Sequence, residues 1–202
     1  IGGDCFALYY EAATGRVTGL NGSGRAPGAL TIDLVRRQGL VRQDGGGARL
    51  ADPLHAHAVT VPGACAGWCD LLARHGSIGI AEALAPAIRL AEDGVPVAPL
   101  TSFHWSRGAE GILARAPGGR AMTIDGRGPR PGEAFRNPGL ARTYRAVAEG
   151  GADAFYRGEI GRDLAAAVRG AGGVMEADDL AAHRSTWDDP IGVAFRGFRV
   201  WE

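Results

Sequence analysis

The chain has 202 residues, of which 46% are hydrophobic and 22% charged, values close to those of soluble globular proteins that bury a sizeable core. Its formal net charge is zero, from 22 acidic and 22 basic residues, so nothing in its charge favours binding to nucleic acid or to an anionic membrane surface. Every basic residue is Arg, which excludes a Walker-type phosphate loop and a pyridoxal Schiff base within these residues, because both need Lys. No membrane segment is expected, because no apolar run approaches the length of a membrane span.

The N-terminal part predicts a β-hairpin followed by a helix. Residues 5–10 and 16–20 have strand character, and Gly15 suits the left-handed position of the turn between them. A turn-rich passage, Asn21-Gly-Ser-Gly-Arg-Ala-Pro27, leads to a helix predicted from about residue 29 to 38. Asp44-Gly-Gly-Gly47 then marks an exposed loop; a glycine run could cradle a phosphate, but no helix opens directly after it, so a turn is favoured.

Residues 55–75 predict a strand that runs directly into a helix. Residues 56–61 are rich in β-branched side chains, and Pro62 has the fixed φ that suits the opening of a helix. Gly63 and Gly67, one helical turn apart, leave a flat strip where another backbone could approach closely. Such a joint is typical of a layered α/β domain, and a second helix is predicted over residues 80–93, closed by Gly94.

The second half predicts an irregular excursion and then a return to helices. Residues 96–136 are rich in Gly, Pro and Arg and are expected to be irregular. Asn137 is a good N-cap before Pro138, and Gly150 is expected to end the helix that follows. Further helices are predicted at 160–170 and 177–183, with a final hairpin formed by residues 191–195 and 198–201. The whole pattern is a helix-rich α+β or α/β layered fold.

Two pairs of residues have spacings that a metal site could use. His55 and His57 would share one face of the predicted strand, and Cys65 and Cys69 stand four apart on the predicted helix. A zinc site needs further ligands at matching spacing, and none is evident, so packing roles are favoured for both pairs. We therefore expect no metal and no cofactor.

Several blocks of sequence between residues 59 and 200 belong to one recognisable pattern. They are Val59-Thr-Val-Pro-Gly-Ala-Cys-Ala-Gly-Trp68, Leu84-Ala-Pro-Ala-Ile-Arg-Leu-Ala-Glu-Asp-Gly-Val-Pro-Val97, Asn137-Pro-Gly-Leu-Ala-Arg-Thr-Tyr144, Ala154-Phe-Tyr-Arg-Gly-Glu-Ile160, Asp178-Asp-Leu-Ala-Ala-His-Arg184 and Phe195-Arg-Gly-Phe-Arg-Val200. In this order they closely resemble the large subunit of gamma-glutamyltransferases, and the resemblance covers nearly the whole chain.

The resemblance implies an αββα sandwich of the N-terminal nucleophile hydrolase type. Residues 1–202 would then be a partial large subunit, with the true N-terminus and the catalytic small subunit outside this chain. In that family a precursor cuts itself, and the newly exposed Thr of the small subunit attacks a gamma-glutamyl amide such as glutathione. The resemblance thus implies two partners, a small-molecule amide and the small subunit. It places no catalytic residue in this chain, which alone is expected to be inactive.

One large-subunit residue of the resembled family contacts the substrate. It is an Arg four positions before the proline of an Ala-Pro pair, and it binds the substrate's α-carboxylate through a guanidinium that matches carboxylate geometry. Here that position holds Ser23, and the nearest Arg is Arg25. In an extended segment, residues two apart point to the same side, offset by about 6 to 7 Å, so Arg25 is the candidate substrate-binding residue, and Gly24 is expected to leave the backbone freer to shift. The alternative is a surface or interface Arg paired to an acid.

Because Arg25 is displaced from the position of the family's Arg, the sequence does not identify the substrate. Acylases on the same fold that act on other amides, of the cephalosporin acylase or oxamate amidohydrolase type, are alternatives because the fold does not decide among them. A non-catalytic binding or structural module is the rival from another class, because these residues contain no nucleophile and base pair.

Overall fold

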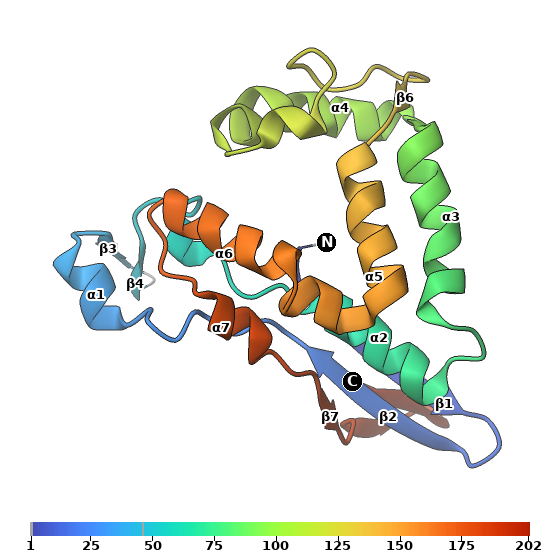
Figure 1. Cartoon of the computed structure of the whole chain (residues 1–202). Helices are drawn as coiled ribbons and strands as arrows, with labels where there is room; N and C mark the ends of the chain where they lie inside the picture. The colour runs from blue at the N-terminus through green and yellow to red at the C-terminus, as the bar shows by residue number, and fades with distance from the viewer. Residues whose placement is uncertain (1, 46) are drawn as a thin grey trace. The chain divides into compact units, whose positions relative to one another are not determined.

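The computed structural model describes residues 2–45 and 47–202 (Figure 1). Contacts along the chain divide it into two compact units. Unit 1 is formed by the residues up to Ser77 together with Ala152–Glu202, and unit 2 is Ile78–Gly151. Among the helices of the described residues, none combines the length and the apolarity needed to cross a membrane.

The centre of unit 1 is an antiparallel sheet with the strand order β1-β2-β7. Strands β1 (Cys5–Glu11) and β2 (Arg16–Gly22) form the predicted hairpin, pairing Cys5 with Gly22 and Glu11 with Arg16. Gly15 has a φ of 71°, which confirms the left-handed turn. Strand β7 (Thr186–Asp188) joins the sheet on the other side of β2.

Helix α2 (Ala64–His75) lies along β1 and β2 (Figure 1). A side chain at Gly67 would place its Cβ 2.7 Å from Cβ of Cys5, so the predicted strip of small residues does allow a close approach of helix and sheet. The strand predicted over residues 56–61 is wrong. A 3₁₀ turn, Ala56–Ala58, forms there, because no strand of the described residues pairs with it and the ring of His55 caps the turn by accepting the amide of His57.

The rest of unit 1 follows the predicted order with shifted boundaries. Thr31 accepts a hydrogen bond from the amide of Leu34, so α1 begins later than expected and is short (Ile32–Arg37). The predicted loop at residues 44–47 is the turn of a hairpin, β3 (Val41–Asp44) and β4 (Gly47–Leu50), and its residue 46 lies outside the described residues. The predicted C-terminal elements are confirmed as α6 (Glu159–Gly170), α7 (Ala177–Ala181), β8 (Gly192–Phe195) and β9 (Phe198–Trp201).

Unit 2 contains the confirmed helix α3 (Ile80–Asp93) and one helix that was not predicted. Residues 96–136 were expected to be irregular, but α4 (Pro99–Gly108) forms there and continues as a π-helical turn, Ala109–Leu113. Only Ser102 of α4 is buried, while Leu100 and Phe103 are 70% and 56% exposed, so α4 has no apolar face that a sequence pattern could reveal. Short strands β5 (Val95–Pro96) and β6 (Ala134–Phe135) pair, and a 3₁₀ turn spans Gly119–Met122.

Helix α5 (Pro138–Tyr156) begins where the sequence predicts, and its helical backbone is broken next to the predicted end. Asn137 Oδ1 accepts the amide of Leu140 at 2.9 Å, which confirms the N-cap. The first helical stretch stops at the predicted place, because Gly151, directly after Gly150, has a non-helical φ of 61° and ψ of −152° that are open almost only to glycine, and a second stretch continues to Tyr156. The interruption coincides with the boundary between the two units.

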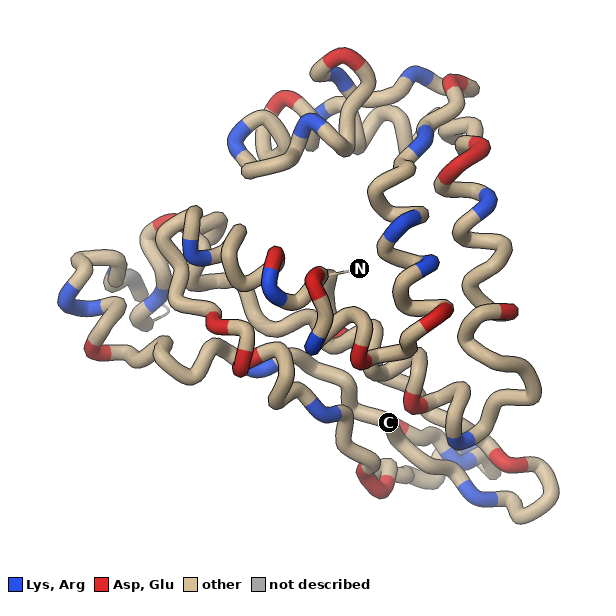
Figure 2. Tube along the Cα trace, in the orientation of Figure 1, with Lys and Arg blue, Asp and Glu red and all other residues tan. Residues whose placement is uncertain are grey.

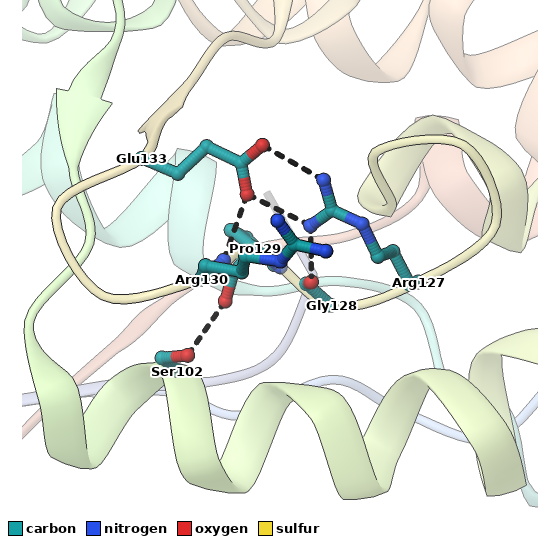
Figure 3. Close-up of polar contacts among 6 residues, drawn as sticks. All are labelled: Ser102, Arg127, Gly128, Pro129, Arg130 and Glu133. Carbon is teal, nitrogen blue, oxygen red and sulfur yellow. Dashed lines mark hydrogen bonds and ion pairs between the residues drawn. The ribbon is translucent and has the colours of Figure 1, made fainter.

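A clamp of polar contacts closes the loop that follows α4 (Figure 3). Arg127 binds Glu133 through both guanidinium nitrogens, at 2.8 and 2.9 Å, and the amide of Arg130 donates to the same carboxylate at 2.8 Å. Ser102 Oγ on α4 donates to the carbonyl of Pro129 at 2.6 Å. The hydrogen bond from Arg127, and then that from the amide of Arg130, hold the pKa of Glu133 at about 2.

Candidate substrate-binding site

The residues around Arg25, which we call the Arg25 segment (residues 22–28), are held by three hydrogen bonds from distant parts of unit 1. The amide of Gly24 donates to Asp4 Oδ1 at 2.7 Å. The carbonyl of Arg25 accepts the amide of Val61 at 3.0 Å. The amide of Gly28 donates to Asp179 Oδ1 at 2.8 Å. The backbone of the segment is therefore fixed on both sides of Arg25.

Close backbone packing fixes the segment further. A Cβ on Gly24 would lie 1.6 Å from the carbonyl oxygen of Val61, and one on Gly63 would lie 1.8 Å from the carbonyl oxygen of Gly22. No side chain fits at either position. The expectation that Gly24 leaves the backbone freer to shift is thus wrong, because Gly24 serves the close approach of two chain segments.

The side chain of Arg25 is exposed, and within residues 2–45 and 47–202 its guanidinium makes no hydrogen bond or ion pair. The alternative in which Arg25 pairs with an acid is therefore not found among the described residues. Ser23, two residues earlier, is half-buried, and its amide donates to Asn21 Oδ1 at 3.0 Å. Arg25 thus presents an unpaired positive charge from an anchored backbone.

A polar cavity of about 370 Å³ lies in the same unit. His183 lines it, and its imidazole has a pKa lowered mainly by burial, so the ring is neutral near pH 7. The charges of Asp70, Arg184, Arg25 and Asp4 also act on this imidazole, although Arg25 is not among the residues that line the cavity. Nε2 of His183 and Oγ of Ser185 are buried without a hydrogen-bond partner among the described residues.

Tyr156 joins the end of α5 to the start of α2. Its hydroxyl donates to the carbonyl of Pro62 at 2.6 Å and accepts the amide of Ala66 at 3.0 Å. Its ring stacks on His183 with 5.3 Å between the ring centroids. The side chain is buried, and burial raises its pKa, so the hydroxyl keeps its proton at physiological pH. Tyr156 therefore fixes the residues directly after Val61, whose amide binds the carbonyl of Arg25.

The two residue pairs considered for metal binding have other roles. Nε2 of His57 lies 2.7 Å from Oε1 of Gln38, and burial lowers the pKa of His57. Cys65 is buried, and its pKa is raised by a hydrogen bond with Cys69 and by burial. In the part of the chain that the structure describes, no three His, Cys, Asp or Glu side chains gather as a metal site would require. Acidic and basic residues are interspersed along the trace of both units (Figure 2).

The anchors Asp4, Val61, Asp179 and the bridging Tyr156 could not be assigned from sequence. Asp4 and Asp179 lie 20 and 151 residues from the amides that they bind, so no local spacing connects them to Arg25. The one available signal was that Val61, Tyr156 and Asp179 each fall inside a block that carries the family resemblance.

Comparison with known proteins identifies the family. The family model of gamma-glutamyltranspeptidase matches residues 1–202. The chain is 32% identical to the glutathione hydrolase-like YwrD proenzyme of Bacillus subtilis (strain 168) over 100% of this chain and 37% of that protein. It is 36% identical to the acylase ACY 1 proenzyme of Pseudomonas sp. (strain SE83) over 95% of this chain and 35% of that protein.

Solved structures agree with these sequence relatives. The cephalosporin acylase of Bacillus halodurans superposes with a TM-score of 0.89 at 37% identity, over 100% of this chain and 37% of the acylase. The gamma-glutamyltranspeptidase of Helicobacter pylori superposes with a TM-score of 0.87 at 24% identity, over 100% of this chain and 56% of that one. These matches confirm the predicted layered fold of the N-terminal nucleophile hydrolase type. The chain spans little more than a third of the length of the two curated relatives, and it belongs to the gamma-glutamyltranspeptidase family.

Proposed function

We propose that this chain is the large-subunit portion of a self-processing amidohydrolase that hydrolyses or transfers the acyl group of a carboxylate-bearing amide, such as a gamma-glutamyl compound. The nucleophile would be the N-terminal Thr of a small subunit that lies outside these residues. Family membership supports the reaction class, and the relatives called proenzymes support processing of a precursor. This chain alone would be inactive.

The proposed substrate class, carboxylate-bearing amides, rests on the free guanidinium of Arg25. It is exposed, it lacks a partner among the described residues, and its backbone is held on both sides. An unpaired Arg on a fixed backbone binds a carboxylate well, because its planar donors match both carboxylate oxygens and little backbone entropy is lost on binding. In our proposal Arg25 therefore binds the carboxylate of the substrate.

An exposed apolar face supports the proposal that further protein covers unit 1. On β1, Phe6, Leu8 and Tyr10 alternate with the side chains that face α2 and are 66%, 48% and 62% exposed. This face borders a cavity of about 570 Å³ that Pro190, Ile191 and Trp201 also line. A monomer rarely leaves so many large apolar side chains in water, so we propose that the small subunit packs here.

An acylase acting on another amide is the second candidate. It is favoured by identities of 36% to the acylase ACY 1 proenzyme and 37% to a cephalosporin acylase, and by 32% identity to an oxamate amidohydrolase proenzyme of Klebsiella pneumoniae. The glutathione hydrolase proenzyme of Bacillus subtilis is 27% identical. Gamma-glutamyl compounds, acylated cephalosporins and oxamate are all amides, so their kcat/KM values can be compared on one enzyme.

The test uses the full-length enzyme and three substrates: a gamma-glutamyl anilide, a cephalosporin with an acyl side chain, and oxamate. The substrate with the highest kcat/KM identifies the candidate. Arg25→Ala is expected to raise KM for that substrate about 10- to 100-fold, because a hydrogen-bonded charge is lost. Arg162→Ala, which removes an exposed Arg of unit 1, is the control. An unchanged KM in Arg25→Ala would refute the binding role of Arg25.

A further inference from the structure

Two carboxylates hold the backbone on either side of Arg25. Asp4 accepts the amide of the residue directly before it, and Asp179 accepts the amide of Gly28, beyond it. Between them the carbonyl of Arg25 accepts the amide of Val61. Asp4 comes from the start of the chain and Asp179 from α7, so parts of unit 1 far apart in sequence converge on the Arg25 segment.

We propose that Asp4 and Asp179 are positioning residues, which set the place of the Arg25 guanidinium by holding the backbone that carries it. This inference rests on the proposed function. Neither carboxylate touches the substrate. Their effect on substrate binding passes through Arg25.

The negative charge of Asp4 is directed at the backbone next to Arg25 and not at the guanidinium of Arg25. The carboxylate of Asp4 engages the amide next to Arg25, but within the described residues it forms no ion pair with the Arg25 guanidinium. A hydrogen bond from an amide to an ionised carboxylate is stronger than one between neutral groups, so it can fix the backbone in an exposed segment. The guanidinium remains available for an external carboxylate, and displacement by about 1 Å is enough to weaken a positioned contact severely.

Asp4 and Asp179 differ in what else they do. Asp179 also takes part in the capping box of α7, in which its Oδ2 accepts the amide of Glu176 at 2.8 Å. A substitution there also weakens the helix end. The side chain of Asp4 makes no other hydrogen bond or ion pair with the described residues, so Asp4 gives the cleaner test.

The experiment measures kcat and KM of the full-length enzyme with two substrates, an accepted carboxylate-bearing amide and the same amide with its carboxylate converted to a methyl ester. Asp4→Ala and Asp179→Ala are expected to raise KM about tenfold for the carboxylate substrate, with kcat within threefold, and to leave KM for the ester unchanged. Asp4→Asn keeps a carbonyl acceptor and should recover part of the loss. Asp178→Ala, the neighbouring acid on α7, is the matched control, because its side chain does not bind the segment.

A double-mutant cycle separates positioning from a general structural role. In an Arg25→Ala background, Asp4→Ala should change KM no further, because the group that it positions is gone. The proposal is overturned if Asp4→Ala leaves KM unchanged while Arg25→Ala raises it, or if Asp4→Ala weakens both substrates equally and adds fully to Arg25→Ala. If Arg25→Ala itself is silent, the proposed function fails and this inference fails with it. Should Asp179→Ala fail to fold, the Asp4 variants alone decide.

Discussion

Arg25 and Arg127 show two different uses of the same side chain. Arg127 is committed to Glu133 through two hydrogen bonds and closes a loop in unit 2 (Figure 3). Arg25 has no such partner among the described residues, although its carbonyl and the amide of Gly24 are both hydrogen-bonded. An Arg paired in the fold stabilises it, whereas an unpaired Arg on a fixed backbone is suited to a ligand.

The contacts of Glu133 with Arg127 and with the amide of Arg130, which we call the Glu133 clamp, should weaken in acid. Its folded pKa is about 2, below the ordinary 4.5, so its stabilisation is present above about pH 4.5 and is lost as the pH falls toward 2. Glu133→Gln should therefore exchange the amide hydrogens of residues 127–133 faster than the wild type at pH 7, and the difference should close as the pH falls through that window. Hydrogen exchange by mass spectrometry on the full-length protein measures it.

A matched control for the clamp is Glu110→Gln, which changes an exposed Glu in the same unit that is not part of the clamp. It should exchange residues 127–133 at the wild-type rate at every pH. A difference between Glu133→Gln and wild type that stays constant from pH 7 to pH 2 would contradict the role assigned to the ionised carboxylate.

At the scale of the elements, Tyr156 ties α5 to α2. Tyr156→Phe leaves the amide of Ala66 and the carbonyl of Pro62 without their buried partner. The loss should lower the free energy of unfolding by about 1–3 kcal/mol, the usual cost of an unsatisfied buried group. Thermal unfolding of the full-length protein should show a lower Tm, while Tyr144→Phe, on the same helix and with a hydroxyl that makes no hydrogen bond to the described residues, should not. Equal Tm values for both variants would refute the assignment.

Elements whose signals are local were predictable from the sequence. The hairpin of β1 and β2 follows from alternation and Gly15, and the start of α5 follows from Asn137 and Pro138. The strand expected over residues 56–61 failed because a strand needs a partner, and β-branched content alone does not supply one. Helix α4 was missed because it buries a Ser and exposes Leu100 and Phe103, the reverse of an amphipathic pattern.

The candidate site was predictable only in part. Arg25 came from a family resemblance, and the structure adds that its side chain is unpaired among the described residues. Its anchors Asp4, Val61 and Asp179 are tertiary contacts between distant segments, and sequence spacing does not encode them. The blocks at residues 59–68 and 178–184 carry the family resemblance, and the fold shows that each provides one anchor of the Arg25 segment, Val61 and Asp179.

At the scale of the whole molecule, unit 1 combines a sheet covered by α2 on one side with an exposed apolar face on the other. Family membership and the length of the relatives agree with a larger protein that covers this face. We propose that Arg25 binds the substrate carboxylate and that the small subunit and its Thr complete a self-processed amidohydrolase.

The most direct test of this account is to run the full-length gene product on a denaturing gel and to sequence any new N-terminus. The account predicts two fragments, the smaller of which begins with Thr, because precursor cleavage exposes the nucleophile. A single uncut chain under conditions where the protein is folded would contradict the account and would favour a non-catalytic member of the family.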